Sequence, residues 1–471
     1  MSIDSIFTIP QIFFPLFFVF MTATGLCLEA ISLRSTMRNA PRRTLDHLPQ
    51  RYTGFEPQIS VLVPAYNESA NIADSIRSLL QLSYTSYEII VINDGSSDST
   101  MEVLKHEFGL RPFPEVYQAS LPTAPIRSIY VSQTHAKLRV IDKDNGGKAD
   151  ALNAGINLSR NPLFCTLDSD SILQRDSLQR LAQPFLDDPL TVATGGMVRI
   201  ANGCTVKEGF LATIGLPTNW LVLFQVLEYY RAFWIGRAGL APMNALLIIS
   251  GAFGLFRKTT VVDAGGYGRH LLGEDMELVV RLHRRLRLRG QPYRICFVPD
   301  AFCWTEAPEH LRSLRNQRIR WQRGLAESLV LNRSLLCHPK GGAAGWLALP
   351  IFILFECLSP AVLVFAYVFV AFCYFTGLWS AEAAMALLAL EIGLGVLTSV
   401  TVLLVDELSF HIYPKFRQVF VLFVAALAEN FGYRQLVSCW RFIGLWRWMI
   451  GAKAGWGTIT RTAAWQVSRN G

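Results

Sequence analysis

Charged residues and paired cysteines are scarce in this sequence. Lys, Arg, Asp and Glu together make up 17% of the 471 residues while hydrophobic residues make up 51%, so the chain is too apolar to be intrinsically disordered. The nine cysteines include no CxxC pair, which disfavours a zinc site or a disulfide framework and predicts a reducing, cytosolic environment. The net charge of +8 is spread without a long Lys/Arg tract, so no binding of nucleic acid is expected.

Several catalytic and targeting motifs are missing as well. The chain has no GxxxxGK[ST] loop, which disfavours ATP hydrolysis. It has no HExxH or HxxH pairing, and we interpret His283 and His310 as ordinary surface residues. No Lys or Arg precedes Arg34, so the basic region of a cleavable signal peptide is absent.

Long apolar runs are present instead, and they predict an integral membrane protein. Residues 12–33 are long enough to cross about 30 Å of hydrocarbon as a helix. Arg34, Arg38, Arg42 and Arg43 follow directly, which predicts that the next segment is cytosolic and that the protein lies in the cell membrane. The last part of the chain, after Glu429, has cations and tryptophans but no acid, which predicts a cytosolic interfacial tail.

The number of membrane spans is left open by the sequence. Three further apolar regions cover residues 346–379, 383–405 and 419–428. The first of them counts 34 residues, too many for one untilted span and too few for two. Three spans here would also leave the basic tail outside, against its charge. We therefore divide the chain into an N-terminal span (1–33), a basic linker (34–56), a cytosolic catalytic domain (57–338) and C-terminal membrane and interfacial helices (339–471).

Residues 57–338 alternate short apolar runs with amphipathic segments, which is typical of an α/β layer fold. The sequence contains no internal repeat. Its Pro-rich stretch over residues 111–125 predicts an inserted loop. Strands are expected over residues 59–63, 88–93, 126–131, 163–167 and 192–199, and helices over 69–81, 97–108, 148–158 and 174–186.

Polar clusters follow these strands or open the helices after them. They read VPAYNES (63–69), NDGSSDS (93–99), DNGGKADALNAG (144–155) and LDSDS (167–171). Open α/β sheets bind ligands beyond the carboxyl ends of their strands. The clusters therefore predict one ligand site at that edge.

Three of the clusters contain residues suited to a nucleotide sugar. Asp168 and Asp170 flank one small residue and offer two hard oxygen ligands to Mg²⁺ or Mn²⁺, whose other positions would go to phosphates and water. Lys148 opens a helix after two glycines, where helix dipole and ammonium favour a diphosphate. Asp94 could accept a hydrogen bond from an imide N–H such as that of uracil.

Two later segments complete the candidate site. GEDMELVVRLHRR (273–285) predicts a helix with Asp275 near its N-terminus, where the dipole keeps a carboxylate ionised and able to accept a proton. Glu277 and Arg281 are expected to form only a surface pair. In QRIRW (317–321), one helix face holds Gln317, Arg320 and Trp321, which suit a pyrophosphate and a sugar ring.

In order, VPAYNES, INDGSSDST, NGGKADALN, LDSDS, GEDMEL and QRIRW resemble the membrane-embedded glycosyltransferases of family 2, the group of cellulose, chitin, hyaluronan and poly-N-acetylglucosamine synthases. The resemblance covers about residues 57–328. It implies a GT-A fold that transfers a sugar from a UDP-sugar with inversion, in the presence of Mg²⁺ or Mn²⁺.

The resemblance also implies a role for each matching residue. Asp275 is the expected general base, and Asp168 and Asp170 the metal ligands. The remaining residues are expected to contact the nucleotide (Pro64, Tyr66, Glu68, Asp94, Lys148 and Asp168) and the diphosphate or acceptor (Gln317, Arg320, Trp321, Ser250, Gly251 and Glu274).

Two acceptors and one inactive alternative stay open at this point. A growing β-linked exopolysaccharide is favoured by resemblance, with poly-N-acetylglucosamine ahead of glucan and an export partner subunit as a further expectation. A non-processive enzyme that glycosylates a membrane lipid is the first alternative. An inactive scaffold of an export complex is the second, although it would be expected to lack Asp170, Asp275 or Arg320, and all three are present.

Overall fold

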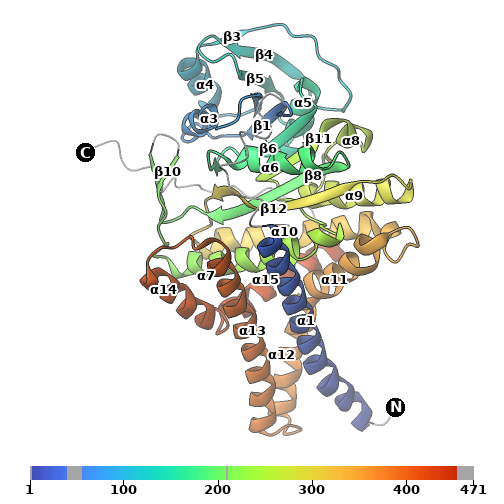
Figure 1. Ribbon diagram of the computed structural model, residues 1–471. Helices are drawn as coiled ribbons and strands as arrows, with labels where there is room; N and C mark the ends of the chain where they lie inside the picture. Colours follow the sequence, from blue (N-terminus) through green and yellow to red (C-terminus); the bar gives the residue numbers. More distant parts are fainter. Residues whose placement is uncertain (1–2, 40–55, 208–209, 453–471) are drawn as a thin grey trace.

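The computed structural model describes residues 3–39, 56–207 and 210–452, and it contains a ten-stranded mixed sheet (Figure 1). The strands lie in the order β3-β4-β5-β2-β1-β6-β11-β8-β12-β7. Neighbours β5, β2, β1 and β6 are parallel, and β11 runs antiparallel between β6 and β8. The strands are β1 (Ile59–Ala65), β2 (Tyr87–Asp94), β3 (Leu110–Pro112), β4 (Ile126–Ser132), β5 (Leu138–Lys143), β6 (Leu163–Leu167), β7 (Ile172–Leu173), β8 (Thr191–Ile200), β11 (Phe253–Arg257) and β12 (Arg294–Thr305), with β9 (Thr205–Lys207) and β10 (Phe210–Thr213) in a separate hairpin.

All five expected strands are confirmed to within two residues, as β1, β2, β4, β6 and β8. Strands β5, β11 and β12 were not predicted. Charged side chains interrupt the apolar pattern of β5, where Arg139 and Lys143 are nevertheless buried. The register of β12 shifts between Val298 and Phe302, so the sequence pattern of its two halves does not predict one continuous strand.

Helices cover both faces of the sheet. They are α3 (Ile72–Leu80), α4 (Thr100–Phe108), α5 (Lys148–Leu158), α6 (Ser177–Asp187), α8 (Lys258–Asp263) and α9 (Glu274–Leu288). Helix α5 has the predicted bounds, whereas α3, α4 and α6 begin three residues later than expected. The polar residues before α3 and α4 remain in the strand-to-helix turns, because their backbone and side chains hydrogen-bond across the neighbouring loop.

Three helices are long and apolar enough to cross a membrane by length and composition, over Ile9–Arg38, Ala344–Phe375 and Ala381–Phe410. The first belongs to α1 (Ile3–Asn39); the others form a hairpin that includes α12 (Ser359–Phe375) and α13 (Ala381–Phe410). The last predicted apolar region forms α14 (Phe416–Ala428), whose 13 residues are too few for a span. Because α12 and α13 form a hairpin, the chain after them lies on the same side as the sheet (Figure 1). Two spans in this region, in place of three, agree with the positive charge of the tail.

Between the sheet and these helices lies an interfacial layer (Figure 1). Its members include α7 (Trp220–Phe233), the π-helix η3 (Trp234–Ala238), α10 (Leu311–Leu331), α11 (Leu349–Ile351), the π-helix η7 (Phe352–Leu358) and α15 (Tyr433–Met449). The 34-residue apolar region therefore divides into an interfacial part and a span: η7 ends next to Pro360, the second residue of α12. The basic linker beyond Asn39 and the tail from Lys453 lie outside the described residues.

Buried ion pairs join the long apolar helices to the sheet. Arg199 of β8 donates two hydrogen bonds to the Asp406 carboxylate of α13, at 2.9 and 3.2 Å. The indole Nε1 of Trp234 donates to the same carboxylate at 3.0 Å. Arg231 of α7 pairs with Glu429, just after α14. Breaking such a buried pair is costly, so the sheet and the helices form one unit.

Two predictions about α9 were wrong. His283 is fully buried, with its ring nitrogens 2.5 Å from the Tyr293 hydroxyl and 2.8 Å from the Leu246 carbonyl. Burial lowers the pKa of His283 to about 4, so the ring is neutral. The pair of Glu277 and Arg281 forms but is also largely buried, because the Arg281 guanidinium holds the loop before α9 through backbone carbonyls. His310, by contrast, is exposed as predicted.

Candidate active site

The polar clusters after β1 and β2 lie against each other at the edge of the sheet. Asn67 has the left-handed conformation (φ 57°), and its side-chain oxygen accepts hydrogen bonds from the backbone N–H groups of Ser97 (2.9 Å) and Asp98 (3.4 Å). In return, the Asp98 carboxylate accepts from the Ser69 N–H at 3.1 Å. Tyr66 is 51% exposed, so its ring is available to a ligand at this edge.

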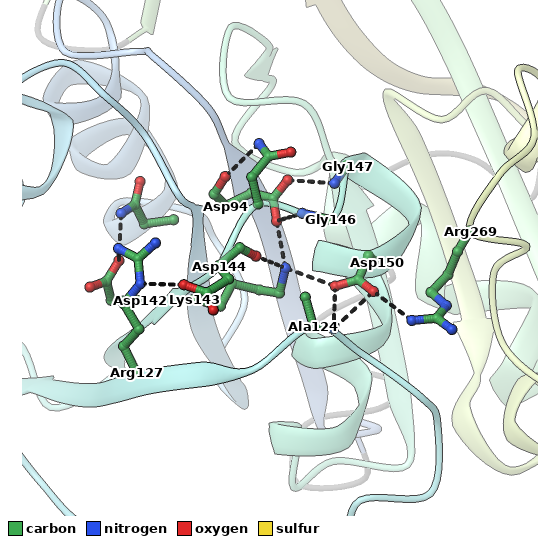
Figure 2. Close-up of polar contacts among 12 residues, drawn as sticks. Asp94, Ala124, Arg127, Asp142, Lys143, Asp144, Gly146, Gly147, Asp150 and Arg269 are labelled. Atoms are coloured by element: carbon green, nitrogen blue, oxygen red, sulfur yellow. Dashed lines mark hydrogen bonds and ion pairs between the residues drawn. The ribbon is translucent and has the colours of Figure 1, made fainter.

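Asp94, at the end of β2, is held inside a buried charge network (Figure 2). Its two oxygens accept hydrogen bonds from Lys143 Nζ (2.6 Å), Gly146 N (3.1 Å) and Gly147 N (2.7 Å). Lys143 is fully buried and also pairs with Asp150 at 2.7 Å. A base contact to Asp94 would have to replace one of these bonds, and the predicted role stays a prediction.

The same network fixes the loop that leads into α5 and so places Lys148. The ammonium of Lys148 forms an ion pair with Asp168 of the DxD motif, and it also lies 3.4 Å from the Gly251 carbonyl. Burial disfavours the charged amine, but the carboxylates of Asp168, Glu274 and Asp275 outweigh this effect and raise the pKa of Lys148. Lys148 is therefore a fixed positive charge beside the DxD motif.

Asp275 reaches the same centre from the first turn of α9. Its Oδ2 accepts a hydrogen bond from the Gly251 N–H at 3.1 Å, and its Oδ1 accepts from the Met276 N–H at 2.8 Å. A Cβ atom added to Gly251 would lie 3.1 Å from Lys148 Nζ and 3.4 Å from Asp275 Oδ2. Glycine therefore lets the backbone pass between these two side chains without a close steric contact. The predicted residues Lys148, Asp168, Gly251 and Asp275 are thus brought together.

Glu274 is the second carboxylate at this centre. It is 8% exposed, and burial together with the adjacent Asp275 raises the pKa of Glu274 to about 7, against the opposing charges of Lys148 and Arg320. Two neighbouring carboxylates in different environments can hold different protonation states near neutral pH. This arrangement suits proton transfer at a substrate hydroxyl.

The helix of the QRIRW motif packs directly on the start of α9. A Cβ atom on Gly324 of α10 would lie 2.7 Å from the backbone nitrogen of Gly273, which shows how closely the two backbones approach. The Ser328 hydroxyl donates to the Gly273 carbonyl at 3.3 Å, and the Glu327 carboxylate accepts from the Leu272 N–H at 3.1 Å. Helix α10 therefore sets the position of Asp275.

Residues of α7 and α10 position the aromatic part of the site. Arg318 is almost fully buried, pairs with Glu228 of α7 at 2.9 Å and hydrogen-bonds the Gln317 side chain at 3.1 Å. Its guanidinium lies 4.3 Å from the ring centre of Trp321, which is 42% exposed. The ring of Tyr229 lies 6.4 Å from that of Trp321. Trp321 is thus held with a face open to a ligand.

Asp170 lies on this side of the DxD motif. Its carboxylate is 8% exposed, and its charge acts on the hydroxyl of Tyr229. Among residues 3–39, 56–207 and 210–452 no group of three or more His, Cys, Asp or Glu side chains could hold a metal ion alone. Asp168 and Asp170 supply at most two protein side chains, as expected for a cation that shares its ligands with a substrate diphosphate.

Sequence reasoning did not identify Lys143, Tyr229, Arg237 or Arg318. Lys143 and Arg318 are buried cations that pair with Asp94 and Glu228, which lie 49 and 90 residues away in the sequence, and no local pattern indicates such pairs. Tyr229 and Arg237 lie on apolar α7 and η3, which sequence reasoning left unassigned. A signal did exist for them, because Tyr229, Phe233 and Arg237 recur at intervals of four residues.

Two family models match the chain. Residues 126–324 match the family described as "Glycosyltransferase like family 2", and residues 60–116 match "Glycosyl transferase family 2". The matches contain β1, β2, β6, the DxD motif, Asp275 and the QRIRW motif.

Curated relatives cover part of the chain. A poly-beta-1,6-N-acetyl-D-glucosamine synthase of Staphylococcus aureus (strain COL) is 33% identical over 273 residues, which are 58% of this chain and 55% of the relative. The synthase of the same name from Staphylococcus epidermidis is 30% identical over 273 residues. The chain therefore spans about half the length of these relatives.

A solved structure shows the fold. The mannosyltransferase from Pyrobaculum calidifontis, in complex with GDP-Man and Mn²⁺, aligns with a TM-score of 0.52 over 89% of this chain and 99% of its own, at 16% identity. The predicted GT-A arrangement of a mixed sheet with membrane-directed helices is confirmed.

Proposed function

Because this chain belongs to glycosyltransferase family 2, we propose that it transfers a sugar from a UDP-sugar to a growing β-linked polysaccharide with inversion at the anomeric carbon. The observation that carries the proposal is the meeting of Lys148, Asp168, Gly251 and Asp275 from four separate elements at one centre. The names of the relatives favour UDP-N-acetylglucosamine as donor.

The residue that accepts the proton is Asp275. It removes the proton of the acceptor hydroxyl as the oxygen attacks the anomeric carbon, and the bond from that carbon to the diphosphate breaks. The Gly251 N–H orients its Oδ2, and its Oδ1 accepts a hydrogen bond from the Met276 N–H in the first turn of α9. Lys148 and Arg320 stabilise the negative charge of the departing diphosphate.

A divalent cation, Mg²⁺ or Mn²⁺, fits the donor set of this site. Asp168 and Asp170 offer hard carboxylate oxygens, and the nucleotide diphosphate would complete the ligands. When bound, such a cation neutralises the diphosphate and makes it a better leaving group. Tyr66, Glu68 and Pro64 would line the nucleotide side, with Ser250 and Gln317 nearer the transferred sugar.

The membrane location follows from the same geometry. Three helices could span a membrane, and the basic residues after α1 favour a cytosolic position for the catalytic domain in the cell membrane. The acceptor would then approach through the interfacial layer, where Trp321 presents its ring. A polysaccharide is our proposal for this acceptor; a membrane lipid is the alternative that the experiment separates.

The test uses the full chain in nanodiscs with Mg²⁺ or Mn²⁺ and a panel of radiolabelled nucleotide sugars. We expect a lipid-free polymer from UDP-N-acetylglucosamine. Asp275→Asn should keep donor binding and lose transfer by about a thousandfold, while exposed Asp263→Asn should behave as wild type. A single sugar on extracted lipid would instead identify a lipid acceptor, and wild-type protein that is silent with every donor would contradict the proposal.

A further inference from the structure

Arg237 lies in η3, the π-helical turn that continues α7 into the interfacial layer. The turn is fixed in place, because Trp234 at its start is fully buried and donates to Asp406 of α13. π-Helical turns are rare and frequently occur at functional sites, since they re-aim one side chain within a helix. Arg237 is one of the five residues of this π-helical turn.

The side chain of Arg237 is partly exposed, and its guanidinium has few partners among the described residues. Its Nε is buried without a hydrogen-bond partner, and its Nη1 donates only to the Ala232 carbonyl, at 3.0 Å. The ring centre of Phe233 lies 4.0 Å beneath it. Within the described residues no carboxylate lies within ion-pair distance of Arg237, whereas Arg199, Arg231 and Arg318 of this region each pair with a carboxylate.

A partly exposed guanidinium that keeps N–H donors and has no carboxylate partner among the described residues can give these donors to a ligand oxygen. The charged groups near Arg237 indicate which part of the site such a ligand would occupy. Burial lowers the pKa of Arg237 to about 10, and the opposing negative charges include Asp275 of α9 and Glu356 of η7. Arg237 is therefore near enough to Asp275 and Glu356 for their charges to act on its guanidinium.

An aromatic row leads to Arg237 along α7. Tyr229, Phe233 and Arg237 are four residues apart, and the ring of Tyr229 lies 6.2 Å from that of Phe233 and 6.4 Å from that of Trp321. Trp321 and Tyr229 offer flat faces for sugar rings, and Arg237 offers N–H donors at the end of the row. Alternating rings and donors are the chemistry that recognises a carbohydrate chain.

We propose that Arg237 forms part of the acceptor subsite and donates hydrogen bonds from its guanidinium to an oxygen of the terminal acceptor sugar, which positions the attacking hydroxyl at Asp275. The inference rests on the proposed glycosyl transfer and deepens it. Arg237 is a substrate-binding residue on the acceptor side, distinct from the residues expected to hold the donor diphosphate.

The experiment separates acceptor binding from donor binding. Full-length protein in nanodiscs is assayed for transfer to a defined β-linked N-acetylglucosamine oligosaccharide, and for hydrolysis of UDP-N-acetylglucosamine by water without acceptor. Loss of charge-assisted hydrogen bonds in Arg237→Gln should raise the acceptor KM about 10- to 100-fold. The donor KM and the hydrolysis rate should stay at wild-type values.

Two variants act as controls. Arg237→Lys keeps the charge without the fork of N–H donors and should fall between wild type and Arg237→Gln. Arg289→Gln, at the exposed C-terminal end of α9, should match wild type.

Three results would overturn the inference. An acceptor KM that does not change in Arg237→Gln would remove Arg237 from the subsite. A raised donor KM or slower hydrolysis would place the guanidinium on the diphosphate instead. A wild-type protein that hydrolyses and transfers nothing would overturn the proposed function, and this inference with it; unchanged donor binding in the variants shows that they are folded.

Discussion

The donor and acceptor halves of the site are built differently. In the donor half, the charges of Asp94, Lys143 and Asp150 neutralise one another inside the sheet domain. In the acceptor half, Trp321 is partly exposed and Arg237 has no carboxylate partner among the described residues. On the proposed assignment, the charges of the donor half are paired within the sheet domain, while the acceptor half is assembled from interfacial helices.

The strongest test of this comparison removes the central charge of the donor half. Lys143→Met leaves Asp94 and Asp150 buried without their cation, and we expect a loss of about 3–5 kcal/mol in the free energy of unfolding. The measurement is thermal or denaturant unfolding of the purified protein. Lys105→Met, at an exposed position on α4, is the matched control. Equal stability of the two variants would mean that the donor half does not depend on this network.

The second prediction concerns the protonation of Glu274, which lies between the donor half and the acceptor half. The pKa of Glu274 is raised from 4.5 to about 7 in the folded protein, so the folded state holds a proton that the unfolded state has released between these values. Stability should therefore fall as the pH rises from about 4.5 to 7, by at most about 3 kcal/mol.

The measurement compares melting temperatures at pH 5 and pH 8 without substrate. Glu274→Gln should flatten this dependence, while Glu102→Gln, exposed on α4, should retain it. An unchanged slope in Glu274→Gln would show that another group is responsible.

The acceptor half should respond to the packing of α10 on α9. Gly324→Ala places a Cβ atom against the backbone of Gly273, and the two helices must move apart. A displacement of Asp275 by a fraction of an ångström to 1 Å should lower transfer about 100-fold, with donor binding retained. Gly393→Ala, where a Cβ meets no atom within 4 Å, serves as the control. If donor binding fell in parallel, the two halves would not be separable in this way.

The smallest effect is expected at Trp321. Its replacement by alanine removes one sugar-stacking face and should raise the acceptor KM about five- to tenfold, with no change in donor KM. Steady-state kinetics with the oligosaccharide acceptor measures both constants. Trp220→Ala is a comparable exposed tryptophan on α7, and an equal response from it would contradict the specific role of Trp321.

The sequence predicted the donor half more fully than the acceptor half, for a physical reason. Residues such as Asp168 and Asp275 lie at strand and helix ends, where local patterns indicate both structure and chemistry. The roles of Arg237 and Arg318 depend on contacts between helices that are far apart in the chain. The prediction that His283 lies on the surface was wrong because a single polar residue on a helix does not show whether a buried partner, here Tyr293, is available.

The ion pair of Arg199 and Asp406 has a consequence for the movement of the product. Because β8 is joined to α13 by two hydrogen bonds that are buried from water, moving the sheet away from this helix would leave two buried charges without partners. In the proposed membrane enzyme, the reaction centre would therefore stay at a constant height above the lipid. A lengthened polysaccharide would then have to slide past this centre after each proposed transfer.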